Sequence, residues 1–299
     1  MTPIELRPFP FHGDAVTAVV TTRHGGVSTG AYGSLNLGDH VGDDPAAVRE
    51  NRRRLAASLG VERLTVGEQT HGDRVAVIGP SLAGRGHDGW ADSREALPGT
   101  DAMVTDRPGA ALAVLVADCA PVVLFDPVTR SAGVAHCGRL GAVRGTLTRT
   151  ISMMRDAFGA RPLDLRAGIG PAIGAASYEI GPAEAAQVTE AFGPAWSNAL
   201  LRPTRPGHAT FDLVSALLRQ LRAAGVPDGN VHPMGIDTRT STEDFFSDRA
   251  ARPCGRFTAV VILRLLSGTG WSTASGTCKA GLRTDTSTRR EVPRGSDHR

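Results

Sequence analysis

Residues 111–137 have the sequence ALAVLVADCAPVVLFDPVTRSAGVAHC, and this stretch decides the fold class. It contains three short apolar runs, Ala111–Val116, Val122–Asp126 and Ala132–His136, which are bounded by Gly, Pro or Asp. Runs of this length and composition predict buried β-strands. Similar runs predict three more strands at Ala15–Thr22, Arg74–Ile78 and Thr258–Leu263.

Helical patterns lie between the predicted strands. Asp44 and Pro45 are typical of an N-cap and a first helical position, and the pattern continues through Val48 and Leu55. Apolar residues spaced three or four apart predict a second helix, namely Leu140, Val143, Leu147, Ile151 and Met154. A third helix is predicted from Phe211, Val214, Leu217, Leu218 and Leu221, and it ends at Gly225. We therefore expect a mixed α/β (α+β) body in which strands outnumber helices.

The charge balance argues against a nucleic-acid-binding protein. The 299 residues include 33 Lys+Arg and 30 Asp+Glu, for a formal net charge of +3, and 41 % are hydrophobic. Residues 267–299 contain six Lys/Arg and three acids, so the rest of the chain is close to neutral. This last stretch is rich in Ser, Thr, Gly and Arg and has no apolar period. We expect one domain over residues 1–266 and a disordered or loosely attached basic tail over 267–299.

Cysteine usage and apolar runs bear on the cellular compartment. Four cysteines without a CxxC pair do not make a disulfide scaffold, which favours a reducing cytoplasm. The opening MTPIELRPFP does not have the pattern of a secretory signal. The longest apolar run, Gly109–Phe125, is interrupted by Asp118 and is shorter than the roughly 20 residues of a membrane helix. We expect a cytoplasmic protein without membrane spans, either a monomer or a weak homo-oligomer.

Three side chains next to predicted strands suggest a metal site. They are His71 in GEQTHGDRV, Cys119 in LVADCAPVV and His136 in GVAHCGRLG. Two imidazoles and a thiolate suit zinc and leave its fourth position open. Their spacing matches no short metal motif, so a loop histidine, a small core cysteine and a core histidine are the alternatives. Cys137 would point to the opposite face of its strand and is not expected to share the metal.

Two long connections, Arg23–Gly42 and Gly79–Thr100, exceed the length of ordinary turns. The first, RHGGVSTGAYGSLNLGDHVG, is dense in Gly, which lets backbone N–H groups approach a ligand closely. It is either a loop that binds phosphate or substrate, or it is an ordinary irregular loop.

Several segments in the same order resemble the multicopper polyphenol oxidoreductase (laccase-domain) family, also described as YfiH-like purine nucleoside phosphorylases. The matching segments span most of residues 18–264 and are TTRHGGVSTGAYGSLNLGDHVGDDPAAVRENRRRL, GEQTHGDRV, TDAMVTDRPGAALAVLVADCAPVVLFDP, GVAHCGRLGAVRG, GPAIGAASYEIG and FFSDRAARPCGRFTAV.

This resemblance implies a single-domain, four-layer αββα sandwich with one catalytic Zn²⁺. The family's zinc ligands correspond to His71, Cys119 and His136, the residues already suspected from their chemistry. The implied activities are phosphorolysis of purine nucleosides (adenosine, inosine, guanosine and methylthioadenosine) and hydrolytic deamination of adenosine. The implied partners are a purine nucleoside and phosphate.

Five further residues are candidates for this chemistry. Arg23 is expected to contact phosphate or substrate, with Asn36 in support, and a solvated surface arginine is its alternative. Asp118 and Asp101 are candidates for orienting a metal ligand or transferring a proton, and a turn-capping role is the alternative for each. Arg139 retains a positive charge close to where relatives carry one and is a candidate substrate contact.

The chain also departs from the family pattern. HCGRLG replaces the common HAGWRG, which puts Arg139 and Leu140 where Trp and Arg are usual. Ala172, Ala176, Ser177 and Asp237 stand where relatives commonly carry cysteines. Fewer thiols weaken the alternative of a copper-dependent phenol oxidase, because soft sulfur donors favour copper. The altered HCGRLG segment motivates a third hypothesis, a divergent member that binds or converts a specialised metabolite.

Overall fold

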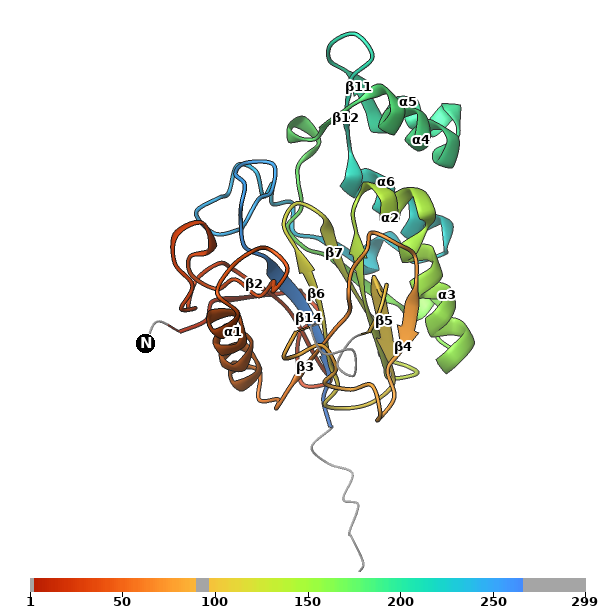
Figure 1. Cartoon of the computed structure of the whole chain (residues 1–299). Helices are drawn as coiled ribbons and strands as arrows, with labels where there is room; N and C mark the ends of the chain where they lie inside the picture. Colours follow the sequence, from red (N-terminus) through yellow and green to blue (C-terminus); the bar gives the residue numbers. More distant parts are fainter. Residues whose placement is uncertain (1–2, 90–96, 266–299) are drawn as a thin grey trace, which may run out of the picture. The chain divides into compact units, whose positions relative to one another are not determined.

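The computed structural model describes residues 3–89 and 97–265 (Figure 1). One compact unit spans Met1–Leu266. The tail expected over 267–299, and part of the long connection Gly79–Thr100, lie outside the described residues.

Two large sheets form the centre of this unit. The first has the strand order β1-β2-β14-β6-β3. Its strands are β1 (Leu6–Pro8), β2 (Val16–Thr21), β14 (Phe257–Leu263), β6 (Ala111–Val116) and β3 (Leu64–Val66). The second has the order β13-β9-β7-β8-β5-β4. Its strands are β13 (Val231–Pro233), β9 (Arg166–Ile169), β7 (Ala120–Asp126), β8 (Ser131–Cys137), β5 (Ala102–Thr105) and β4 (Val75–Val77).

Side-chain alternation along the strands explains why the two sheets pack face to face. In β7, Val123 and Phe125 belong to the core between the sheets, whereas Val122 and Leu124 belong to the core under the helices. Successive residues of a strand point to opposite faces, so a strand buried on both sides has a continuous apolar sequence. The six predicted strands all form, with ends that differ by one or two residues.

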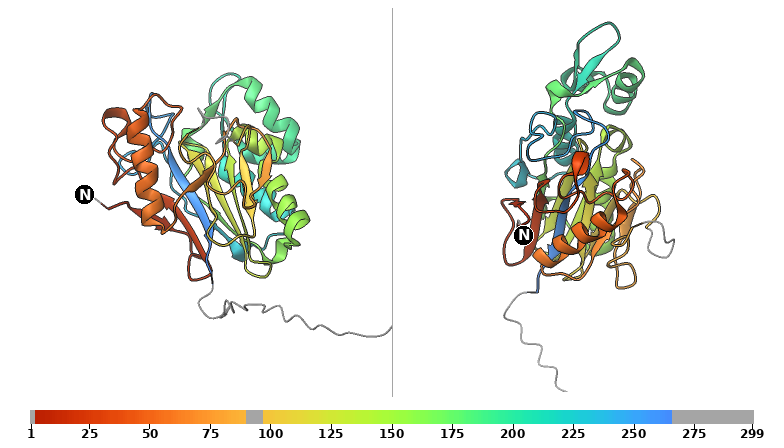
Figure 2. Two further views of the ribbon diagram at one scale, coloured as in Figure 1. Left: turned by 60° about the horizontal axis from the view of Figure 1, so that its bottom comes forward. Right: turned by 60° about the vertical axis from the view of Figure 1, so that its left-hand side comes forward.

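Helices cover the outer face of each sheet and complete four αββα layers, which confirms the predicted fold class (Figure 2). Helix α1 (Pro45–Ser58) packs on the first sheet through Leu55 and Ala56. Helices α2 (Arg139–Arg144), α3 (Thr146–Phe158) and α6 (Leu213–Ala223) pack on the second sheet. As predicted, Asp44 caps α1, and its side chain accepts a hydrogen bond from the backbone N of Ala46.

A smaller sheet with two helices lies beyond one end of the sandwich (Figure 1). It has the order β10-β12-β11, and the sequence patterns did not mark it. Its elements are β10 (Glu179–Ile180), α4 (Pro182–Phe192), α5 (Pro194–Leu200), β11 (Leu201–Pro203) and β12 (Ala209–Phe211). It places Tyr178, which directly precedes β10, beside the site described below.

Two helix predictions were wrong in detail. The stripe from Leu140 to Met154 is divided between α2 and α3, because Gly145 adopts φ +77 and ends α2. The third predicted helix begins two residues later than expected. Phe211 belongs to β12, and Asp212 caps the helix by accepting a hydrogen bond from Ser215 N. Of the helices in the described part of the chain, none has the length and apolar character to cross a membrane.

Candidate metal centre

His71, Cys119 and His136 come together although they lie far apart in the sequence. His71 lies in the loop between β3 and β4, Cys119 in the turn between β6 and β7, and His136 near the end of β8. Their ligand atoms all lie within 4.8 Å of one another, and His71 Nε2 is 3.7 Å from Cys119 Sγ. Sulfur and nitrogen ligands of a tetrahedral zinc are about 3.6 Å apart, given Zn–S near 2.3 Å and Zn–N near 2.0 Å. The donor set and its spacing therefore fit a zinc ion.

Close packing behind the three donors depends on a glycine. A Cβ at Gly138 would lie 2.6 Å from Cys119 Sγ, which is closer than real Cβ contacts. Gly138 adopts an ordinary φ of −87, so its role is to leave space and not to permit an unusual backbone. This glycine is visible in the sequence HCG, but the spacing of residues in the sequence did not reveal that it leaves room for Cys119.

Asp101 connects two of the three candidate ligands. Its buried carboxylate accepts hydrogen bonds from the backbone N atoms of Thr70, His71 and Gly72 at 2.8 to 3.1 Å. It also accepts one from His136 Nδ1 at 2.8 Å, which leaves Nε2 of that ring for a metal. His71 itself adopts φ +57, so these backbone bonds hold a strained loop. Burial alone would raise the pKa of Asp101, but His136 and the backbone donors lower it.

Asp118 stabilises the turn that carries Cys119. This residue adopts φ +84, and its carboxylate accepts hydrogen bonds from Thr238 Oγ1 and Ser247 Oγ at 2.6 Å and from Arg249 N at 2.7 Å. Three donors occupy most of its acceptor capacity. Asp118 thus ties the β6–β7 turn to segments more than a hundred residues away.

Cys119 and His136 shift each other's pKa in opposite directions. Burial alone raises the pKa of the Cys119 thiol, but the charges and hydrogen bonds of His136 and His71 outweigh it and lower the pKa to about 6. Burial lowers the pKa of His136, but Cys119 and Asp101 outweigh it and raise the pKa to about 9. A low thiol pKa makes the thiolate available as a metal ligand near neutral pH. Cys137 is fully buried in the core beneath the helices, and burial raises its pKa.

The three donors open into a cavity of about 330 Å³. One wall is apolar and includes Leu115, Val116 and Ile173. The lining also includes Tyr178, whose pKa is raised to about 12, mainly by burial, so its hydroxyl remains a hydrogen-bond donor. The volume is at the lower end of the range for small-molecule sites.

Three arginines and an aspartate of the segment after Ser247 also line this cavity, and the sequence patterns assigned them no role. They are Asp248, Arg249, Arg252 and Arg256. The segment FFSDRAARPCGR contains all three arginines, so its charge density was the available signal. Only the tertiary structure reveals that they face the distant His71, Cys119 and His136.

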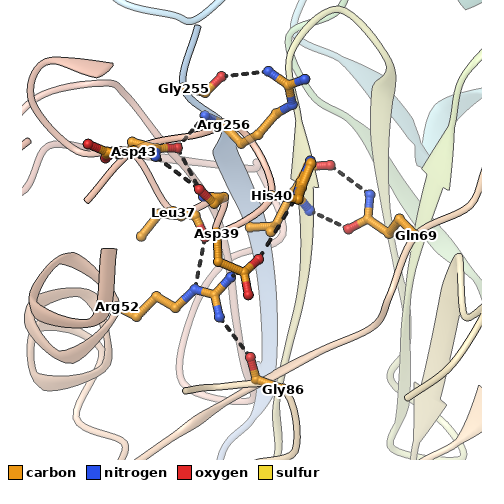
Figure 3. Close-up of polar contacts among 12 residues, drawn as sticks. Leu37, Asp39, His40, Asp43, Arg52, Gln69, Gly86, Gly255 and Arg256 are labelled. Atoms are coloured by element: carbon orange, nitrogen blue, oxygen red, sulfur yellow. Dashed lines mark hydrogen bonds and ion pairs between the residues drawn. The ribbon is translucent and has the colours of Figure 1, made fainter. Parts of the chain in front are cut away.

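The glycine-rich connection Arg23–Gly42 supplies His40 to the cavity wall. Figure 3 shows how this segment is held: the buried Arg52 donates to the carbonyls of Leu37 and Gly86, each at 2.8 Å. Gln69, which also lines the cavity, is fixed because its side chain exchanges two hydrogen bonds with the backbone of Leu115 at 2.7 Å.

Arg23 and Asn36 do not reach the cavity and instead hold loops together. Arg23 Nε donates to the carbonyl of Gly33 and Nη1 to that of Thr242, both at 2.8 Å, and its guanidinium lies 4.4 Å from the Phe246 ring centroid. Asn36 is fully buried, and its Oδ1 accepts from the backbone N atoms of Gly38 and Arg256. Neither residue lines the cavity.

Arg139 is also absent from the cavity lining. It starts α2 and donates a short hydrogen bond to Gln187 of α4, which ties the two helices together. Among the altered cysteine positions, Asp237 has a clear structural role. Its carboxylate accepts from Gly174 N at 2.9 Å and Ser177 Oγ at 2.6 Å, and so anchors the loop that leads to Tyr178.

Comparison with known proteins agrees with this architecture. Residues 17–264 match the family described as multi-copper polyphenol oxidoreductase laccase. The chain belongs to this family.

Its relatives include a Streptomyces griseus protein named purine nucleoside phosphorylase ORF3, which is 40 % identical over 87 % of this chain and 99 % of that protein. The crystal structure of YlmD from Geobacillus stearothermophilus is 35 % identical, with a TM-score of 0.79 over 84 % of this chain and 93 % of that one. The crystal structure of the Bacillus licheniformis hypothetical protein YfiH is 30 % identical, with a TM-score of 0.80 over 86 % of this chain and the whole of that one.

Proposed function

We propose that this protein is a zinc-dependent purine nucleoside phosphorylase whose metal ligands are His71, Cys119 and His136. The observation that carries the proposal is the convergence of these three donors on one cavity that also holds three arginines. Relatives named purine nucleoside phosphorylase, up to about 40 % identical over more than four fifths of the chain, support the same reaction. When bound, zinc would supply a Lewis acid in the cavity that these three residues line.

The reaction requires the cavity to hold two substrates of different character. Phosphorolysis joins a phosphate oxygen to the anomeric carbon of the ribose and breaks the bond from that carbon to the purine. The bonding electron pair leaves with the purine nitrogen, which takes up a proton. An apolar wall of Leu115, Val116 and Ile173 suits the purine ring, and fixed cationic groups suit the phosphate.

Asp101 and Asp118 are proposed as positioning residues and not as proton carriers. The carboxylate of Asp101 is fully buried and accepts from three backbone N atoms and one ring nitrogen. Asp118 lines the cavity but accepts from three donors. Tyr178, whose phenol stays protonated, is an uncharged donor that lines the cavity.

Adenosine deamination is a second proposed activity of the same site. In that reaction water adds to the ring carbon that carries the amino group, and ammonia leaves. Both reactions require the purine nucleoside in the same cavity, so they would compete for it.

Phenol oxidation by copper receives less support. Two histidines and a cysteine also suit copper, but reduction of oxygen to water takes four electrons and several redox metals. Within residues 3–89 and 97–265, only one candidate ligand group contains a sulfur donor.

Product analysis tests the proposal. Zinc-loaded protein is incubated with inosine or adenosine, with and without inorganic phosphate. Phosphorolysis predicts free base and ribose 1-phosphate only with phosphate, and deamination predicts inosine and ammonia from adenosine in either case. Zinc-loaded protein that converts no purine nucleoside would refute the proposed function.

A further inference from the structure

One carboxylate and three guanidinium groups from a single segment line the cavity together, and two of the guanidinium groups contact the carboxylate. Asp248, Arg249, Arg252 and Arg256 come from a single nine-residue stretch, and all four line the cavity that contains His71, Cys119 and His136. Three cations and one anion leave this part of the lining with a net positive charge. Such a lining attracts an anionic ligand.

Both oxygens of Asp248 are engaged by arginines. Oδ2 lies 2.7 Å from Arg252 Nε and 2.5 Å from Arg252 Nη2, so two N–H groups of this guanidinium contact one carboxylate oxygen. Oδ1 lies 3.5 Å from Arg256 Nη2. Two oxygens of a phosphate can make the same contacts, because guanidinium groups pair with phosphate and carboxylate in the same way. The Asp248 carboxylate therefore occupies an oxyanion position.

Two of the arginines are held in place by bonds that a ligand need not disturb. Arg256 Nη1 donates to the carbonyl of Gly255 at 3.0 Å (Figure 3). It also donates to the carbonyl of Cys254 at 3.1 Å, and 20 % of the Arg256 side chain is exposed. Arg249 Nη1 donates to the Glu179 carbonyl at 2.9 Å, and its guanidinium lies 5.3 Å from the Tyr178 ring centroid. Fixed donors lose little conformational entropy when they bind a ligand.

Arg252 is the most weakly anchored member of the set. Its side chain is 76 % exposed, and the hydrogen bonds recorded for it are all to Asp248. A side chain at the rim that pairs with a neighbouring carboxylate can exchange that partner for a ligand at small cost, because exposed ion pairs are weak.

We propose that Arg249, Arg252 and Arg256 bind the phosphate that attacks the nucleoside, and that Asp248 competes with this phosphate for Arg252 and Arg256. This inference rests on the proposed function, and it assigns the co-substrate to a part of the lining that includes neither Arg23 nor Arg139. Phosphate held there shares the cavity with the candidate metal ligands. Its attacking oxygen forms the new bond to the anomeric carbon as the purine leaves, and the sugar phosphate product keeps the contacts to the arginines.

Because Asp248 competes with phosphate, two substitutions should change the affinity for phosphate in opposite directions. Arg252→Gln removes a charge-assisted donor and should weaken phosphate binding about tenfold. Asp248→Asn removes the competing carboxylate and should tighten phosphate binding about threefold to tenfold. General damage to the site would not produce an opposite pair, because it weakens binding in both variants.

A matched pair elsewhere in the chain serves as the control. Arg222 and Asp228 form an ion pair at 2.6 Å with side chains that are 61 % and 68 % exposed, and neither lines the cavity. Arg222→Gln and Asp228→Asn therefore make the same chemical changes in another ion pair, whose aspartate is more exposed than Asp248, at 68 % against 29 %. Both should leave phosphate binding unchanged.

The experiment measures inorganic phosphate binding to the zinc-loaded full-length protein by isothermal titration calorimetry. In the same variants, KM is measured separately for phosphate and for inosine. The KM for phosphate should follow the calorimetric Kd, while the KM for inosine should stay within about twofold. Arg252→Lys, which keeps the charge without the planar fork, should recover part of the loss.

The outcomes separate this inference from the proposed function. Binding that changes as expected in a protein that cleaves no nucleoside would support the phosphate site and refute the phosphorylase. Phosphorolysis with the same KM for phosphate in Arg252→Gln, Asp248→Asn and wild-type protein would support the phosphorylase and overturn the phosphate site. Equal weakening in both variants would also overturn it.

Discussion

Two groups of side chains in the described part of the chain have ligand atoms within 4.8 Å of one another, but their surroundings differ. His71, Cys119 and His136 line a cavity, and Asp101 stands behind two of them. Glu5, His24 and Asp244 instead surround a cation that the chain already supplies. Arg7 Nη2 lies 2.5 Å from Asp244 and 3.6 Å from Glu5.

The comparison shows that close spacing of donor atoms is not sufficient for a metal site. In the first group a buried carboxylate, that of Asp101, bonds to a donor ring, orients this histidine and favours a cation in the cavity. In the second group a guanidinium fills the role of the cation and forms partly exposed ion pairs. We call these the metal group (His71, Cys119, His136) and the arginine-filled group (Glu5, His24, Asp244).

Removing one donor from each group should give the largest contrast. Cys119→Ser and His136→Ala are expected to lose bound metal and to reduce nucleoside cleavage by more than the roughly 100-fold that loss of an outer partner costs. His24→Ala should change neither quantity, because Arg7 already neutralises its neighbours. Metal content per chain and kcat/KM are the measurements. A Cys119→Ser protein that keeps its metal and activity would contradict this account.

Substituting the aspartates that hold the metal group in place should have the next largest effect on zinc binding. Asp101→Asn replaces an acceptor with an amide and disturbs both the His136 Nδ1 bond and the backbone around His71. We expect zinc affinity to fall about 10- to 100-fold in a chelator competition assay. Asp118→Asn should reduce it less, because the three donors to that carboxylate come from no metal ligand. Equal losses in the two variants would indicate general destabilisation.

The reactivity of Cys119 in the metal group should also depend on pH in an unusual way when no metal is bound. Because the pKa of Cys119 is lowered to about 6, its alkylation by iodoacetamide should be nearly constant above pH 7 and fall about tenfold between pH 7 and pH 5. The sign follows because the thiolate reacts and protonation at low pH removes it. His136→Ala should move the midpoint upward, since burial then dominates, and zinc should block the reaction.

This assay has internal controls. Cys137 and Cys254 are buried with raised pKa values and should not react, and Cys278→Ser removes the cysteine outside the described residues. A midpoint near the ordinary value of a free thiol, about 8.5, would show that the histidines do not stabilise the thiolate.

Removing the cation from the arginine-filled group should have the smallest effect. Arg7→Met deletes the ion pair to Asp244 and the contact between its guanidinium and the Phe245 ring, whose centroid is 5.1 Å away. The side chains of Arg7 and Asp244 are about one third exposed, so we expect a loss of about 1 kcal/mol in the free energy of unfolding. Urea denaturation measures it. If the arginine-filled group of this variant binds zinc as tightly as the metal group does, the proposed difference between the two groups is wrong.

The long strands could be predicted from the sequence because they are buried on both faces, namely β2, β6, β7, β8 and β14. The shorter strands β1, β3, β5, β9 and β13 of the same two sheets were missed. Continuous apolar runs such as Ala111–Val116 need no knowledge of tertiary contacts to be recognised. The break between α2 and α3 was missed because the apolar stripe continues across it, while Gly145 alone changes the backbone direction.

The chemistry of the donors, supported by family resemblance, predicted the composition of the metal group, but sequence could not predict what surrounds it. Arg23 was a reasonable phosphate contact by its position in a glycine-rich loop, yet its guanidinium is held by Gly33 and Thr242. The arginines that do line the cavity are about 130 residues from Cys119 in the chain. The position of these arginines at the cavity depends on the pairing of β14 with both β2 and β6, and no local sequence pattern predicts that pairing.

X-ray absorption at the zinc edge of the loaded protein tests the central claim most directly, because the metal group contains a sulfur donor and the arginine-filled group contains none. The account predicts one zinc per chain with one sulfur at about 2.3 Å and two imidazole nitrogens at about 2.0 Å. A zinc surrounded by oxygen and nitrogen alone, without sulfur, would contradict it.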